Sequence, residues 1–109
     1  MVAEDDMSTI KIRSKRLANY TLVRILIAHP METGKRKDDD SGELVPAHFI
    51  QTLNFKYNDQ LMSQCQMGVG IAKNPFFSFR LKSAQAGDVV SISWQDNLGY
   101  SDSAEHIIR

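Results

Sequence analysis

The sequence contains a single cysteine and no long apolar run. Because Cys65 is alone among the 109 residues, a disulfide within the chain and a cysteine-based metal cluster are excluded. No apolar run approaches the roughly 20 residues that a membrane-spanning helix requires. Residues 1–9 are acidic and lack the apolar stretch of a secretory signal. We therefore expect neither a transmembrane segment nor a signal peptide in this chain.

An excess of charge of either sign is also missing. Lys and Arg number 13, and Asp and Glu number 13, so the formal net charge is zero. We therefore expect no general electrostatic attraction to nucleic acid or to a membrane surface. The length suits one domain, and we divide the chain into a flexible N-terminal extension, residues 1–9, and a folded domain, residues 10–109.

Apolar and polar residues alternate along much of the chain, which is typical of β-strands with one buried face. The clearest examples are residues 10–15, 49–57, 76–82 and 88–94. Turn signals such as Asn58-Asp59 separate about seven such segments. This spacing predicts an all-β, immunoglobulin-like antiparallel sandwich. We expect its core to contain Ile25, Leu53, Phe79, Ile92 and Trp94.

Residues 20–28 differ from this pattern because both faces of the predicted strand are apolar. Val23, Ile25 and Ile27 lie on one face, and Leu22 and Leu26 lie on the other. Two explanations are open for the second face: a partner chain covers it, or a loop of this chain does. Phe76, opposite the core-facing Phe77, is a further candidate for exposed apolar surface.

Residues 30–46 form a long connection that contains three basic residues followed by three aspartates. It is either a solvated hairpin whose charges cancel or a loop that binds a partner. His29 and His48 flank it, and Met31 lies beside His29. These three residues could ligate copper if the loop closes, but their spacing matches no metal motif. We expect structural hydrogen bonds from both imidazoles, and no metal or cofactor.

The remaining chemistry-bearing residues do not indicate an enzyme. Cys65 has no basic neighbour in sequence and shares a strand face with apolar residues, so we expect it to pack as a small hydrophobe. A Ser/His/Asp set can be assembled on paper, but no GxSxG turn marks an activated serine. Its members are Ser101, Asp102, Ser103 and His106. We therefore expect a binding or assembly module without a catalytic site.

Seven short blocks, in order along nearly the whole chain, resemble the SoxZ family. They are HPMETG at 29–34, RKD at 36–38, PAHFI at 46–50, KNPFFSF at 73–79, AGD at 86–88, WQDN at 94–97 and SDSAE at 101–105. A single short motif can arise by chance, whereas this ordered series is specific. The chain is therefore identified as a member of the SoxZ family by resemblance.

The resemblance implies a fold, a partner and a pathway. SoxZ proteins are immunoglobulin-like sandwiches that pair with SoxY, and SoxYZ carries sulfur intermediates during bacterial thiosulfate oxidation. The intermediates are held on a cysteine in a glycine-rich arm near the SoxY C-terminus. SoxAX, SoxB and, where it is present, SoxCD act on them there. Residues 104–109 of this chain have neither a glycine arm nor a cysteine, which agrees with the non-catalytic half of such a carrier.

The resemblance also sets expectations for location and contacts. The pathway is periplasmic, so we expect co-export with a SoxY-like chain that carries a twin-arginine signal. We expect a heterodimer with that chain, and self-association where SoxY is absent because zero net charge gives little protection. The candidate interface consists of Leu22, Leu26, His29, Met31, His48 and Phe76.

Two other functions stay open at this stage. One is a stand-alone thiol carrier that uses Cys65. The other is a small metal-binding β-sandwich that uses His29, Met31 and His48.

Overall fold

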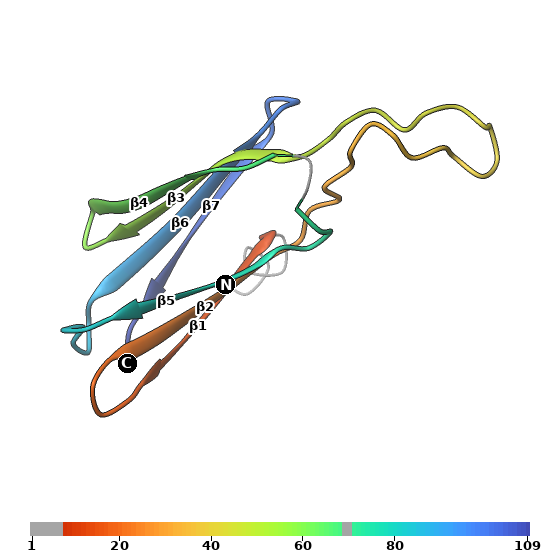
Figure 1. Ribbon diagram of the computed structural model, residues 1–109. Coiled ribbons are helices and arrows are strands. Elements are labelled where there is room, and N and C mark those ends of the chain that lie inside the picture. The colour runs from red at the N-terminus through yellow and green to blue at the C-terminus, as the bar shows by residue number, and fades with distance from the viewer. Residues whose placement is uncertain (1–7, 69–70) are drawn as a thin grey trace.

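Seven β-strands form two antiparallel sheets in the computed structural model, which describes residues 8–68 and 71–109 (Figure 1). One sheet has the order β1-β2-β5 and the other the order β4-β3-β6-β7. The strands are β1 (Ile10–Arg16), β2 (Thr21–Ile27), β3 (Ile50–Tyr57), β4 (Gln60–Gln66), β5 (Phe76–Leu81), β6 (Val89–Asp96) and β7 (Ser101–Ile107). This architecture confirms the predicted all-β sandwich. The described residues include no helix of the length and apolar content that crossing a membrane requires.

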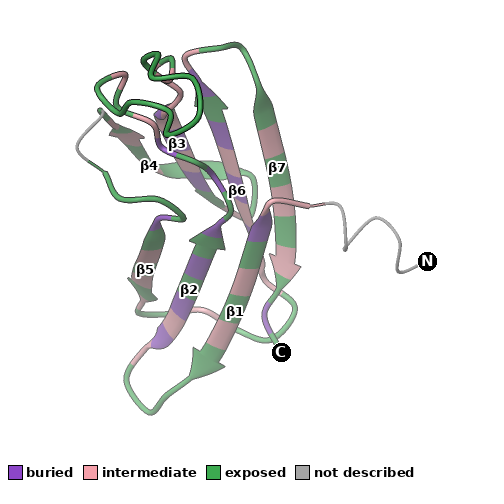
Figure 2. Cartoon of the chain, turned by 90° about the vertical axis from the view of Figure 1, so that its right-hand side faces the viewer, coloured by how far each residue is buried: buried purple, intermediate pink, exposed green. Residues whose placement is uncertain are grey.

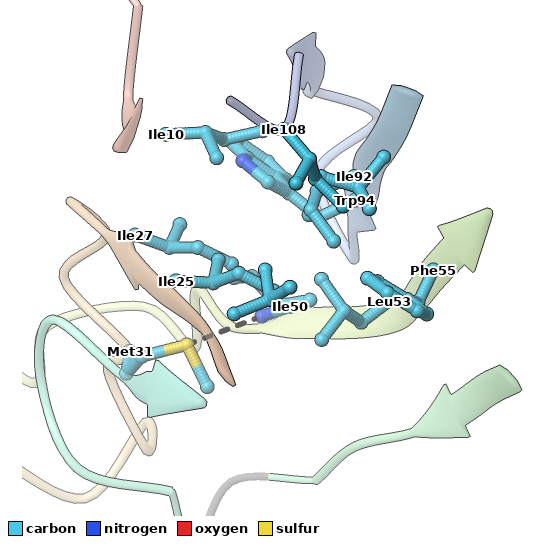
Figure 3. Close-up of a cluster of buried hydrophobic side chains, with 12 residues drawn as sticks. Ile10, Ile25, Ile27, Met31, Ile50, Leu53, Phe55, Ile92, Trp94 and Ile108 are labelled. Atoms are coloured by element: carbon cyan, nitrogen blue, oxygen red, sulfur yellow. Dashed lines mark hydrogen bonds between the residues drawn. The ribbon is translucent and has the colours of Figure 1, made fainter. Parts of the chain in front are cut away.

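The core between the sheets consists of the inward-facing side chains of both layers (Figure 3). Of the predicted core residues, Ile25, Leu53, Ile92 and Trp94 are buried. Phe79 is only half-buried, because it lies on the edge strand β5, but its ring stacks on Phe55 with centroids 4.1 Å apart. The alternation pattern therefore identified the inward face correctly, and position within the sheet determined how deeply each residue is buried.

Two irregularities in the pairing of β3 with its neighbours, one with its extra residue in β3 and one with it in β4, change which residues face inward. The pairing of β3 with β6 shifts between Ile50 and Thr52, and this shift places both Ile50 and Leu53 in the core. The pairing with β4 shifts between Phe55 and Lys56. Leu61, which alternation placed on the same face as Cys65, is 51% exposed. An extra residue in one strand moves the following side chains to the opposite face, so strict alternation fails on either side of a bulge.

The N-terminal segment is fastened to the sandwich before β1 begins. Residues 1–7, most of the predicted flexible extension, lie outside the described residues. The amide and hydroxyl of Thr9 donate to Asp102 on β7, at 2.9 and 2.7 Å. The indole of Trp94 donates to the Thr9 hydroxyl, at 3.1 Å. Together with a 2.7 Å hydrogen bond between Ser14 and His106, these contacts join β1 to β7 across the two sheets.

We expect Ile92→Ala to lower the free energy of unfolding by about 2–5 kcal/mol, because it removes buried methyl groups from the centre of the core and leaves a cavity. Ile107→Ala is the matched control, since Ile107 is 58% exposed at the end of β7. The free energy of unfolding of this control should fall by less than about 1 kcal/mol. Urea unfolding measures both, and equal losses would contradict the assignment of the core.

Candidate functional site

A buried carboxylate joins the two ends of the long connection to the β6–β7 hairpin. His29 directly follows the residue after β2, His48 precedes β3 by two residues, and Asp96 ends β6. The Nε2 atoms of His29 and His48 lie 3.1 and 2.6 Å from Asp96 Oδ2. The two imidazole rings meet edge to face with centroids 4.6 Å apart. Loop closure therefore brings the two histidines together, as the sequence suggested, but around an aspartate that was not predicted.

The second oxygen of Asp96 is also fully engaged. Its Oδ1 accepts hydrogen bonds from the backbone amides of Leu98 and Tyr100, at 3.0 and 2.9 Å. Burial raises the pKa of Asp96, but the hydrogen bonds from His29, His48 and the two amides outweigh it, so the pKa lies below its ordinary value. The carboxylate is therefore charged at neutral pH and is stabilised by four donors.

The hydrogen bonds of His29 argue against a metal at this cluster. Its Nδ1 accepts the amide N–H of Met31, at 3.1 Å, so the ring proton lies on Nε2 and is donated to Asp96. A metal at Nε2 would need the lone pair that this proton occupies, and ligating histidines normally donate from the other nitrogen. Met31 itself is buried, and its sulfur accepts the amide of Ile50 at 3.4 Å (Figure 3). The donor set of His29, Met31 and His48 is thus not assembled.

The long connection between β2 and β3 forms an irregular hairpin that projects from one end of the sandwich (Figure 1). Bridges pair Glu32 with His48 and Lys37 with Leu44. Arg36 and Glu32 form an ion pair at 2.7 Å, four residues apart in the chain. The geometry is that of the solvated hairpin considered from the sequence. A partner-binding role for this hairpin stays a prediction.

The predicted interface residues fall into two groups. Leu26 and Phe76 are direct neighbours across the β2–β5 pairing and are 42% and 59% exposed, so no loop of the described chain covers them. Figure 2 shows how buried and exposed positions alternate along β2. Leu22 lies on the same outer face and is half-buried, and His48 is partly exposed. His29 and Met31 are buried by this chain's own residues. These two support the base of the hairpin and offer almost no surface to a partner.

Cys65 lies on β4 and packs against the core as a half-buried side chain. Its sulfur lies 3.9 Å from the Ser63 hydroxyl. A reactive thiolate is favoured by exposure and a neighbouring cation. The surroundings of Cys65 instead agree with the predicted packing role.

The Ser/His/Asp residues of β7 are divided between the two faces of the sheet. Asp102 and His106 point toward β1, where they bind Thr9 and Ser14. Ser101 and Ser103 are exposed on the alternate face. Alternation along one strand therefore keeps the serines apart from the acid and the imidazole.

The comparison with family models agrees with the resemblance of the sequence blocks. A family model described as Sulphur oxidation protein SoxZ matches residues 10–106, nearly the whole chain. The comparison with curated proteins finds no match.

We expect Asp96→Asn to reduce the free energy of unfolding by about 1–3 kcal/mol at neutral pH, because an amide group would meet the two histidine donors. The folded pKa of Asp96 is below the ordinary value of about 3.9. Its charged form therefore stabilises the fold fully above that value, and this contribution is lost as the pH falls through the folded pKa. The difference between wild type and variant should shrink accordingly in acid.

Urea unfolding across a pH series tests this expectation. Asp39→Asn, in the exposed part of the hairpin, is the control and should have no comparable effect. Equal stability of wild type and Asp96→Asn at neutral pH, or a difference that persists unchanged in acid, would contradict the role assigned to Asp96.

Proposed function

The chain belongs to the SoxZ family and has a role in sulfur oxidation, and we propose that it is the non-catalytic subunit of a SoxYZ sulfur carrier. In this proposal a SoxY-like chain holds the sulfur intermediates of thiosulfate oxidation on its own cysteine. The present chain binds and supports that partner as a heterodimer. The family match over residues 10–106 is the observation that carries the proposal.

Exposed apolar surface on the three-stranded sheet supports a partner-binding role. Leu26 and Phe76 lie side by side on the outer face of β2 and β5, where a monomer gains nothing by exposing them together. We propose that this face meets the SoxY-like chain, with Leu22 at its margin. The hairpin between β2 and β3 would then project toward the partner's carrier arm, with His48 at its base.

The proposal places the complex in the periplasm, exported through a signal on the SoxY-like chain. Transient encounters with SoxAX, SoxB and, where it is present, SoxCD would occur while the partner's cysteine is loaded. The surroundings of Cys65 support a structural rather than a carrier role for this thiol, since the side chain packs against the core.

We expect Cys65→Ser to leave thiosulfate-dependent turnover of the reconstituted pathway unchanged, with a small loss of stability because a hydroxyl replaces a weakly polar thiol. Turnover with wild-type and variant chains, each checked for its unfolding midpoint, measures this. If a well-folded variant lost turnover, the carrier function would move to this chain.

Co-expression with the cognate SoxY-like chain should give a stable heterodimer by size-exclusion chromatography at micromolar concentration. The reason is the apolar surface of β2 and β5, which the partner would remove from water. Phe76→Asp should weaken co-elution, whereas Met62→Asp is the control, since Met62 is exposed on β4 of the other sheet. Separate elution of the two wild-type chains would refute the proposed function.

A further inference from the structure

The outer face of the β1-β2-β5 sheet has several cations and no strand carboxylate, although the net charge of the chain is zero. Its outward positions alternate with the buried ones, and the cations among them are all exposed (Figure 2). Five basic residues occupy it: Lys11, Arg13, Lys15, Arg24 and Arg80. The three strands contain no Asp or Glu. Among the described residues, no salt bridge joins any of the five to a carboxylate. We call these five residues, with Leu22, Leu26 and Phe76, the basic face.

The strand register arranges the basic face in three rows across the sheet. Lys11 pairs with Leu26, which pairs with Phe76. One row further along, Arg13 lies directly opposite Arg24. The third row runs from Lys15 through Leu22 to Arg80. The apolar pair of the first row thus has a cation on one side, Leu22 in the third row has cations on both sides, and two cations meet in the row between them.

The Arg13–Arg24 pair is unfavourable within the isolated chain. Like charges directly opposite each other on neighbouring strands destabilise a sheet. An acidic residue at either position would replace that repulsion with an attraction. A bound surface that supplies carboxylates would relieve the repulsion, because guanidinium groups pair with carboxylates in a bidentate geometry.

The outer face of the other sheet has a different chemistry. Its outward positions are mainly neutral polar residues, including Asn54, Gln64, Ser93 and Ser103. Its two strand residues of opposite charge, Lys56 and Glu105, lie in one row on either side of Ser91. The separation of charge is therefore specific to one face. Arg80 is also held in place, since its guanidinium lies 5.0 Å from the centre of the Tyr20 ring.

We infer that the basic face binds an acidic surface of the SoxY-like partner, with Leu26 and Phe76 as the apolar centre of the contact; this inference rests on the proposed function. Partner carboxylates would surround that centre and pair with the arginines. A second copy of the chain is a poor occupant, because face-to-face pairing would set cations against cations. A purely apolar partner surface would leave the five cations desolvated and unpaired.

Charge reversal on the basic face tests the inference. Two single variants are made, Arg13→Glu and Arg24→Glu. Lys56→Glu on the other sheet is the control, since it changes the net charge by the same amount. Each single reversal converts the like-charged pair into an opposite-charged one, so folding should be retained or improved. Binding to the cognate SoxY-like chain is followed by surface plasmon resonance at about 0.05 M and about 0.5 M NaCl.

We expect the association rate of the wild type to fall about tenfold or more between the two salt concentrations. Arg13→Glu or Arg24→Glu should slow association at low salt by about tenfold and flatten its salt dependence, while Lys56→Glu should behave like the wild type. Thermal unfolding of the free variants checks that each is folded, so that slower association is not caused by unfolding.

Other outcomes overturn the inference in distinguishable ways. If the SoxY-like chain binds with the same rate to all variants and at both salt concentrations, the basic face is not the contact, but the proposed function stands. If it does not bind the wild type at all, the proposed function fails. If the reversals abolish only self-association, or only binding to phosphatidylglycerol vesicles, the occupant is a second copy or a membrane and the inference is wrong.

Discussion

The end of the sandwich from which the β2–β3 hairpin projects depends on the hydrogen bonds of one buried carboxylate, that of Asp96. It accepts hydrogen bonds from His29 and His48, which stand at the two ends of the β2–β3 connection, and from two amides of the β6–β7 turn. A buried charge is costly unless its hydrogen-bonding capacity is filled, and here four donors fill it. Three segments that are distant in sequence are thereby held at one point, and the projecting hairpin begins from a fixed base.

This arrangement gives the histidines a structural purpose. The Nδ1 of His29 accepts the Met31 amide, which fixes the tautomer that donates to Asp96. Met31 adopts a left-handed backbone conformation, with φ of 48°, and buries its sulfur against Ile50. The histidine cluster therefore closes the core at the loop. The exposed apolar side chains Leu26 and Phe76 lie elsewhere, on the outer face of the β1-β2-β5 sheet.

Much of the fold could be predicted from alternation and turn residues. The Asn58-Asp59 turn has positive φ at both positions, as a tight hairpin requires, and the inward faces of β2 and β6 were identified correctly. Alternation could not place Ile50 or Leu61, because a bulge in β3 and another in β4 shift the pairing. It could not find Asp96 either, since an aspartate that begins a turn is ordinarily exposed. Nor could it show that cations from three separate segments form one face, because that depends on which strands are neighbours.

The central claim is that this member of the SoxZ family contacts its partner through the outer face of β1, β2 and β5. Hydroxyl-radical footprinting of the chain alone and with the cognate SoxY-like chain tests it at individual side chains. We expect oxidation of Phe76 and Leu26 to fall in the complex, while Met62, exposed on β4 of the other sheet, reacts at the same rate. Unchanged oxidation of Phe76 and Leu26 in a complex that has formed would contradict it.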